Sequence, residues 1–165
     1  GYTYLARATL ITRQANTSQF SVFTRMAYGL KKDLGQDMEI MEDLKKVTIQ
    51  LKDQVLFSSG VSELSPNSAR TLDELAESLK LVDGPIIVEG HTDNVAIVGG
   101  RFPSNWELSA ARAFSVVDAL TKKGVNPAQL SAWGFGEFRP IASNDDPQGK
   151  TRNRRIEIVV FNKDK

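Results

Sequence analysis

The sequence predicts an α+β domain in which two helices cover one face of a mixed sheet, with an extra helix at the N-terminal end. Two observations support this prediction. Short segments in which apolar and polar residues alternate are typical of half-buried strands, and two longer segments with apolar residues every three or four positions are typical of helices. Their order along the chain is β-α-β-α-β-β, which predicts a two-layer sandwich.

The composition excludes several classes of function. The chain has 165 residues, 41% of them hydrophobic and 25% charged, and its net charge is +1. Such a small charge does not attract nucleic acid, and we expect no nucleic-acid partner. There is no cysteine and His91 is the one histidine, so disulfides, thiolate chemistry and multi-histidine metal centres are excluded within one chain. We therefore expect no metal and no cofactor.

Residues 1–45 are predicted to form a linker and helical segment that precedes the domain. From residue 20 the apolar residues fall three or four positions apart, which predicts one helix with a single apolar stripe: Phe20, Phe23, Ala27, Leu30, Leu34, Met38 and Met41. Gly29 and Gly35 each weaken such a helix by roughly 1 kcal/mol relative to alanine. The stripe therefore needs a packing partner, which is either the domain itself or a second copy of the chain.

Residues 46–165 are predicted to form the domain. Its first strand is indicated by Val47, Ile49 and Leu51, which alternate with polar residues. A helix is expected to begin at Ser65-Pro66, because proline is tolerated in the first helical turn, and to end before Gly84-Pro85. The second strand is expected at residues 85–89.

A second helix is predicted from about Asn105 to Gly124. Ser104 and Glu107 have the spacing of a capping box, in which two side chains satisfy free N–H groups at a helix start. A third strand is expected at residues 131–134. After a loop rich in Gly, Pro, Asn and Asp, the apolar run at residues 155–161 predicts the last strand.

Three polar residues are expected to face one cavity. Asp93 follows the second strand, and ligands are favoured just past the carboxyl ends of strands. Asn105 lies at a helix N-terminus, and Arg112 comes two turns later on roughly the same side. Asp93 would bind an ammonium group and Arg112 a carboxylate, so the set suits a zwitterion. The alternative is structural: Asp93 caps its own loop and Arg112 forms an ion pair within the protein.

An enzymatic function is less well supported. His91 could act as a general base beside Asp93, which leaves a hydrolase as an alternative. No Ser or Cys lies in a recognisable nucleophile setting, however, and no two acids can be placed opposite each other as in a glycoside hydrolase. The basic cluster of Arg152, Arg154 and Arg155 lacks the interleaved aromatic residues of a nucleic-acid site. We expect a non-catalytic protein.

Several motifs occur in order between residues 47 and 161 and resemble the pattern of OmpA-like peptidoglycan-binding domains: Gly90-His91-Thr92-Asp93, Asn105-x-x-Leu108-Ser109-x-x-Arg112-Ala113, Gly124-Val125, Gly134-x-Gly136-Glu137-x-x-Pro140 and Asn153-Arg154-Arg155-Ile156-Glu157-Ile158. The resemblance implies an OmpA-like β-α-β-α-β-β fold that binds the meso-diaminopimelate side chain of peptidoglycan stem peptides. It implies Asp93 and Arg112 as the central contacts. Asn105, Thr92 and either Arg154 or Arg155 are implied around them.

Residues 104–109, Ser-Asn-Trp-Glu-Leu-Ser, resemble the MotB/PomB stator subunits of the flagellar motor. This finer resemblance implies a periplasmic homodimer that anchors the motor stator to the cell wall. The parent protein would lie in the inner membrane beside an A-type stator subunit, with residues 1–45 as linker, plug and dimer contact. In the stator subunits a transmembrane helix precedes the wall-binding domain, so the resemblance implies one here, and the start at Gly1 rather than Met would explain why this sequence lacks it. The alternative is an OmpA-like outer-membrane protein or lipoprotein that tethers the envelope to peptidoglycan.

Overall fold

The computed structural model describes residues 19–97 and 100–163. A five-stranded mixed sheet forms one layer, in the order β1-β2-β5-β3-β4. Its strands are β1 (Met38–Glu42), β2 (Lys46–Lys52), β3 (Ile86–His91), β4 (Leu130–Gly134) and β5 (Arg155–Phe161). Only β3 and β4 pair in parallel, joined by a crossover through α3 (Asn105–Lys122). The predicted α+β class and the two-layer arrangement are confirmed.

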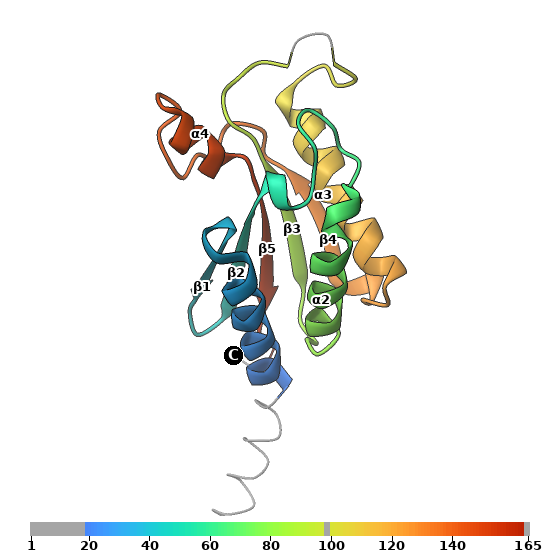
Figure 1. The fold of residues 1–165 in the computed structure, drawn as a ribbon. Helices are drawn as coiled ribbons and strands as arrows, with labels where there is room; N and C mark the ends of the chain where they lie inside the picture. Colours follow the sequence, from blue (N-terminus) through green and yellow to red (C-terminus); the bar gives the residue numbers. More distant parts are fainter. Residues whose placement is uncertain (1–18, 98–99, 164–165) are drawn as a thin grey trace, which may run out of the picture.

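Helices cover one face of this sheet. The N-terminal helix at residues 19–34 and α2 (Ala69–Leu79) lie side by side against it, and α3 covers β3 and β4 (Figure 1). Alternation along the strands directs every second residue toward the helices, such as Ile49 in β2, Val88 in β3 and Ile158 in β5, all fully buried. None of the described helices has the length and apolar character needed to cross a membrane.

The N-terminal helix is shorter than its apolar stripe predicts. It ends at residue 34, where Gly35 adopts a φ of +60°, a left-handed conformation that glycine favours at helix ends. Met38 and Met41 belong instead to β1, which pairs antiparallel with β2. The prediction of a helix through Met41 is therefore wrong, because the methionine spacing in a short strand coincided with a helical step.

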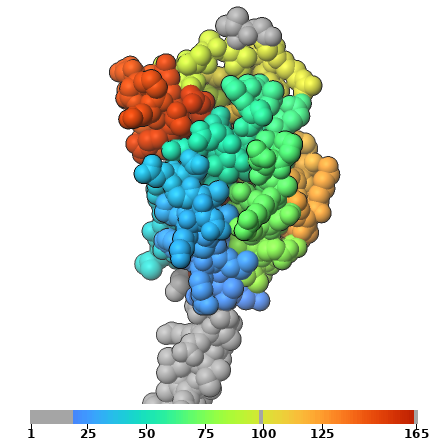
Figure 2. Space-filling view, viewed as in Figure 1, coloured from blue at the N-terminus to red at the C-terminus, as the bar shows by residue number. Residues whose placement is uncertain are grey.

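The helical part of this segment packs on the domain. Phe23, Ala27 and Leu30 are buried in the same core as the sheet. Figure 2 shows the helix lying against α2 over much of its length. The stripe therefore finds its packing partner within the chain that carries it.

The remaining predicted elements are confirmed with small shifts in their ends. A 3-10 turn at Pro66–Ser68 leads into α2, and β3 extends two residues past its predicted end, to His91. Ser104 is the N-cap of α3, and its hydroxyl oxygen accepts the Trp106 N–H at 3.2 Å. The loop before β5 contains a helix that the sequence did not predict, α4 (Pro147–Asn153), whose N-cap is Asp146.

Candidate functional site

The strand directions bring three chain segments to one edge of the sheet. Both β2 and β3 run antiparallel to β5, so their carboxyl ends lie beside the amino end of β5. Asp53 follows β2, Asp93 follows β3 by two residues, and Arg154 immediately precedes β5. The two strand ends therefore supply acids, and the start of β5 supplies a base.

The first turns of α3 face the same edge because β3 and α3 approach closely. A Cβ atom on Gly90 would lie 2.0 Å from the backbone oxygen of Ser109, and one on Gly134 would lie 2.5 Å from the nitrogen of Ala110. Only glycine fits at either position. The glycines of these two motifs thus let the strands approach α3 and bring Asp93 near Asn105 and Arg112.

These segments enclose a pocket of about 610 Å³. The loop after β2, the loop after β3, α3 and the residue before β5 contribute to its wall. Its lining includes five of the six residues expected at the site, namely Thr92, Asp93, Asn105, Arg112 and Arg154. The spacing argument for Asp93, Asn105 and Arg112 therefore placed these three residues correctly in one cavity.

Arg112 is held by contacts within the protein. Its Nη1 lies 3.0 Å from Asp53 Oδ2, its Nε donates to the Val61 carbonyl at 2.8 Å, and its Nη2 donates to the Ser58 carbonyl at 3.3 Å. The guanidinium also lies 4.9 Å from the centre of the Phe57 ring. The side chain is buried, so these contacts fix its planar group at the pocket wall.

Asp93 joins its own loop to β5. Its Oδ1 accepts the Val95 N–H at 3.0 Å, and its Oδ2 lies 2.6 Å from Nη1 of Arg154. The amide of Asn105 donates to the Val95 carbonyl at 3.0 Å, so α3 supports the same turn. Both contacts of the structural alternative are thus present, since Asp93 caps its loop and Arg112 forms an ion pair, and both residues also line the pocket.

Neighbouring arginines in the last motif point in different directions. Arg154 lines the pocket, whereas Arg155 lies over the open face of the sheet, where its Nε donates to Glu157 at 2.5 Å. Arg155 also donates to the carbonyls of Asn153 and Arg139. Arg154 is therefore the arginine of this motif that reaches the expected site, and Arg155 does not line it.

Asp53 belongs to the site although sequence reasoning missed it. Its carboxylate pairs with Arg112 and lies 3.9 Å from Nε of Arg154, so it links the two bases of the pocket. The signal that pointed to Asp93, an acid just past the end of a strand, also applies to Asp53. Nothing in the local residue pattern indicated that both strand ends would meet at one edge.

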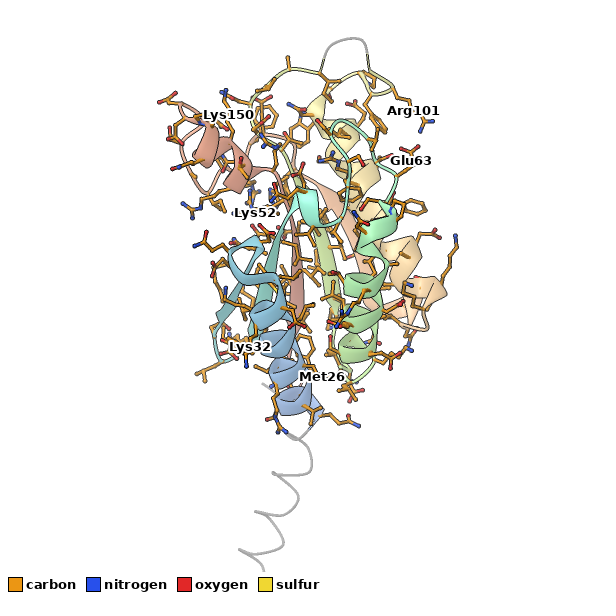
Figure 3. All side chains as sticks on the ribbon, in the orientation of Figure 1. Met26, Lys32, Lys52, Glu63, Arg101 and Lys150 are labelled. Atoms are coloured by element: carbon orange, nitrogen blue, oxygen red, sulfur yellow. The ribbon has the colours of Figure 1, made fainter. Side chains whose placement is uncertain are left out.

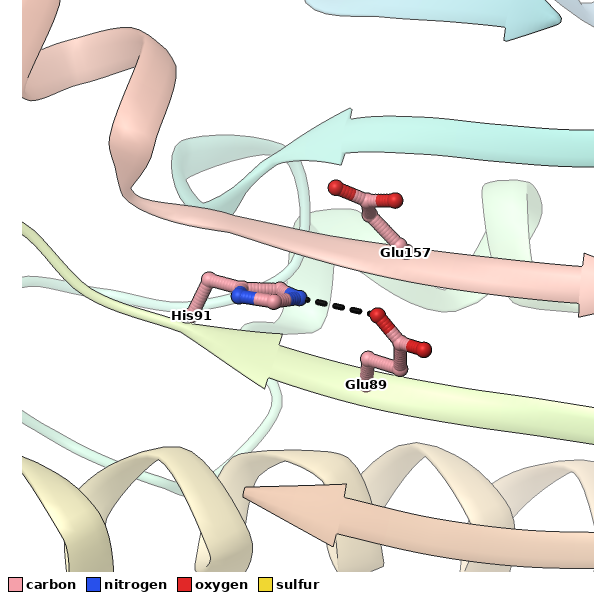
Figure 4. A group of neighbouring side chains, drawn as sticks. All are labelled: Glu89, His91 and Glu157. Atoms are coloured by element: carbon pink, nitrogen blue, oxygen red, sulfur yellow. Dashed lines mark hydrogen bonds and ion pairs between the residues drawn. The ribbon is translucent and has the colours of Figure 1, made fainter. Parts of the chain in front are cut away.

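His91 lies away from the pocket. Its Nε2 is 3.0 Å from Glu89 Oε1, and both side chains lie with Glu157 on the sheet face that the helices leave open (Figure 4). Phe135 stacks on the imidazole with ring centres 5.2 Å apart. The placement of His91 as a general base beside Asp93 is therefore wrong, because β3 ends at His91 and Asp93 lies in the loop that follows, where its carboxylate contacts Val95 and Arg154.

An exposed ion pair bridges the two loops that flank the pocket. Arg101, in the loop after β3, pairs with Glu63, in the loop after β2 (Figure 3). A hydrogen bond to its own backbone and, after it, the pairing with Arg101 lower the pKa of the Glu63 carboxyl below the usual value. Exposed pairs of this kind contribute little to stability, so the bridge mainly limits how the loops sit relative to each other.

Comparison with known proteins identifies a family and several relatives of this chain. Residues 56–154 match the family described as "OmpA family". Motility protein B of Bacillus subtilis is 33% identical over 133 residues, covering 79% of this chain and 51% of that protein. The peptidoglycan-binding protein ArfA of Mycobacterium tuberculosis is 37% identical over 107 residues, covering 64% of this chain and 32% of that protein. The chain thus spans about half, or less, of the length of these relatives.

A solved structure shares most of the fold. The cell wall anchor of the type VI secretion system from Pseudomonas aeruginosa superposes with a TM-score of 0.78 at 32% identity. The superposition covers 84% of this chain and 97% of the anchor. The similarity therefore extends over most of this chain and nearly all of the anchor.

Proposed function

Because this chain belongs to the OmpA family, we propose that it binds peptidoglycan without catalysing a reaction and thereby anchors a membrane complex to the cell wall. The observation that carries the proposal is the shared pocket of Asp93, Asn105, Arg112 and Arg154. The names of two similar proteins, a peptidoglycan-binding protein and a cell wall anchor, support the same function.

The ligand group is proposed to be the zwitterionic end of a meso-diaminopimelate side chain. The pocket contains two carboxylates, from Asp53 and Asp93, and two guanidinium groups, from Arg112 and Arg154. Asp93 would accept the ligand ammonium, because each carboxylate oxygen can accept more than one hydrogen bond. The N–H groups of Arg112 that its protein contacts leave unused would bind the ligand carboxylate. Thr92 and Asn105 complete the wall around the ligand.

The absence of catalysis is proposed from the chemistry of the pocket. The sequence has no cysteine, and its one histidine points to the other face of the sheet. The acids of the pocket are paired with arginines, which suits binding of a charged ligand rather than proton transfer. A charge-balanced pocket of this kind retains a zwitterion without transforming it.

The anchored complex is proposed to be the flagellar motor stator. Motility protein B supports this assignment, and so does the Ser-Asn-Trp-Glu-Leu-Ser segment at residues 104–109. In this proposal the chain is the periplasmic part of an inner-membrane protein, acts as a homodimer and assembles with an A-type stator subunit. Every residue that lines the pocket lies within residues 46–165, which we assign to wall binding, and residues 1–45 are assigned to the linker and dimer contact.

Two assays test this proposal. In the first, the purified chain is titrated with a diaminopimelate-containing tripeptide and binding is measured by calorimetry. In the second, the chain is sedimented together with purified cell wall. Asp93→Ala and Arg112→Ala are each expected to abolish binding in both assays. The matched control is Asp118→Ala, which removes an exposed acid of α3 that pairs with Lys122. If both pocket variants sediment with the wall as the parent does, the site assignment is wrong. Release of soluble fragments from the wall would overturn the non-catalytic assignment.

A further inference from the structure

Two large aromatic side chains form an exposed stacked pair beside the pocket. Trp106, in the first turn of α3, and Phe138, after β4, have ring centres 4.8 Å apart and planes inclined by 24°. Trp106 is 48% exposed and Phe138 is 58% exposed. A contiguous apolar pair on a surface indicates an interaction site more strongly than a single exposed ring does.

The folding of α3 does not account for the indole ring. Trp106 contributes its backbone N–H to the cap formed by Ser104, a role that any residue except proline can fill. The ring itself lies outside the core. Phe138 is likewise not part of the core, so both rings keep an apolar surface in contact with water.

The pair is fixed to the same backbone as the pocket. Trp106 directly follows Asn105, which lines the pocket. Gly136 has a φ of +60° and turns the chain against α3, so that a Cβ placed on it would lie 3.4 Å from the Trp106 nitrogen. The carbonyl of Gly136 accepts the Thr92 N–H at 2.9 Å, and its N–H donates to Ser109 Oγ at 2.9 Å. The aromatic pair and the pocket wall are therefore joined by direct backbone contacts.

We propose that Trp106 and Phe138 form a saccharide subsite, which binds a sugar ring of the polymer whose stem peptide occupies the pocket. This inference rests on the proposed function. The flat face of an aromatic ring complements the C–H face of a pyranose, and burying that contact removes apolar surface from water. In peptidoglycan the peptide is attached to a sugar, so a peptide held in the pocket carries a saccharide with it. Glu107, which is exposed, and Glu137, which is half-buried, are the sequence neighbours of Trp106 and Phe138 and can bind sugar hydroxyl groups.

The test compares two ligands: the disaccharide-tripeptide of peptidoglycan and the same tripeptide without sugars. The parent chain is expected to bind the disaccharide form about 3- to 10-fold more tightly, the range that an aromatic contact supplies. Trp106→Ala and Phe138→Ala are each expected to remove this preference and to leave the affinity for the free tripeptide unchanged. Phe114→Ala is the matched control, since it removes another exposed aromatic ring of α3 and should keep the preference.

The outcomes separate this inference from the proposed function. Equal affinity of the parent for both ligands overturns the subsite and leaves peptide binding intact. An equal loss of affinity for both ligands in Trp106→Ala also overturns the subsite, because the indole ring would then support the peptide pocket rather than bind the sugar. Failure of the parent to bind either ligand overturns the proposed function. A shift from dimer to monomer in sedimentation velocity, caused by Trp106→Ala or Phe138→Ala without ligand, would assign the pair to a protein interface and overturn the subsite.

Discussion

The guanidinium of Arg112 and the carboxylate of Asp53, which lie 59 positions apart in the sequence, form a buried ion pair with 3.0 Å between Nη1 and Oδ2. The pair joins the second turn of α3 to the end of β2, and both side chains are at least 87% buried. It therefore connects the two layers of the fold at the wall of the pocket. A change at either residue should affect stability as well as binding.

Asp53→Ala should lower the free energy of unfolding by about 3–5 kcal/mol, because it leaves the Arg112 charge buried without its partner. The measurement is urea unfolding followed by circular dichroism. Asp118→Ala is the control, since its pair with Lys122 is exposed and should contribute less than about 1 kcal/mol. Equal and small decreases in the free energy of unfolding in both variants would show that the buried pair does not hold the two layers together.

Arg112→Lys should weaken ligand binding at least tenfold even though the charge is retained. A lysine ammonium cannot reproduce the planar set of contacts with Asp53, Val61 and Ser58 while also presenting N–H groups to a carboxylate. The affinity for a diaminopimelate tripeptide would be measured by calorimetry at constant pH. An unchanged affinity would mean that a point charge is sufficient and that the ligand carboxylate does not depend on the planar guanidinium.

Gly90→Ala should destabilise the fold by more than about 3 kcal/mol, since the added methyl group overlaps the Ser109 carbonyl of α3. Gly29→Ala should have the opposite effect. Outside its chain neighbours and the backbone of its own helix, nothing lies within 4 Å of a Cβ at Gly29, and alanine is favoured over glycine in a helix by about 0.8–1.0 kcal/mol. Thermal melts of the two variants test the expected loss of stability in Gly90→Ala and the expected gain in Gly29→Ala. A well-folded Gly90→Ala chain would show that the approach of β3 to α3 is not tight.

Asn153→Ala should disorder the loop before α4 and weaken binding indirectly. The buried amide of Asn153 accepts the N–H groups of Ile141 and Ala142 and donates to the Ala142 carbonyl and to Asn144. Its loss should cost about 2–3 kcal/mol, because several buried polar groups lose their partner. Hydrogen exchange should show faster exchange of the Ile141 and Ala142 amides. Protection equal to that of the parent would contradict the role of this side chain.

The pattern of apolar residues predicted most of the fold because it reflects local geometry. Alternation marked Val47, Ile49 and Leu51 as one face of a strand, and the seven-residue spacing placed Asn105 and Arg112 on one side of a helix. Both inferences depend only on the side-chain periodicity within one strand or one helix. They were confirmed by β2, by α3 and by the shared pocket.

The same pattern was ambiguous where segments were short. The spacing of Met38 and Met41 continued a helical stripe, but the left-handed turn at Gly35 and the pairing of Met38 with Leu51 made this segment a strand. A strand of five residues carries too few positions to separate its period from that of a helix. Pairing with β2, which a local pattern does not encode, decided the outcome.

By itself, the sequence determined most of the strands and helices, though not β1 or α4, and it indicated Asp93, Asn105 and Arg112 as one polar set. Only the tertiary structure decided that Asp53 joins them, that Arg154 rather than Arg155 faces the pocket, and that His91 faces away. The physical reason is that local periodicity fixes the direction of a side chain relative to its own element. The order and direction of strands in the sheet, set by long-range pairing, fix which of those directions converge on one site.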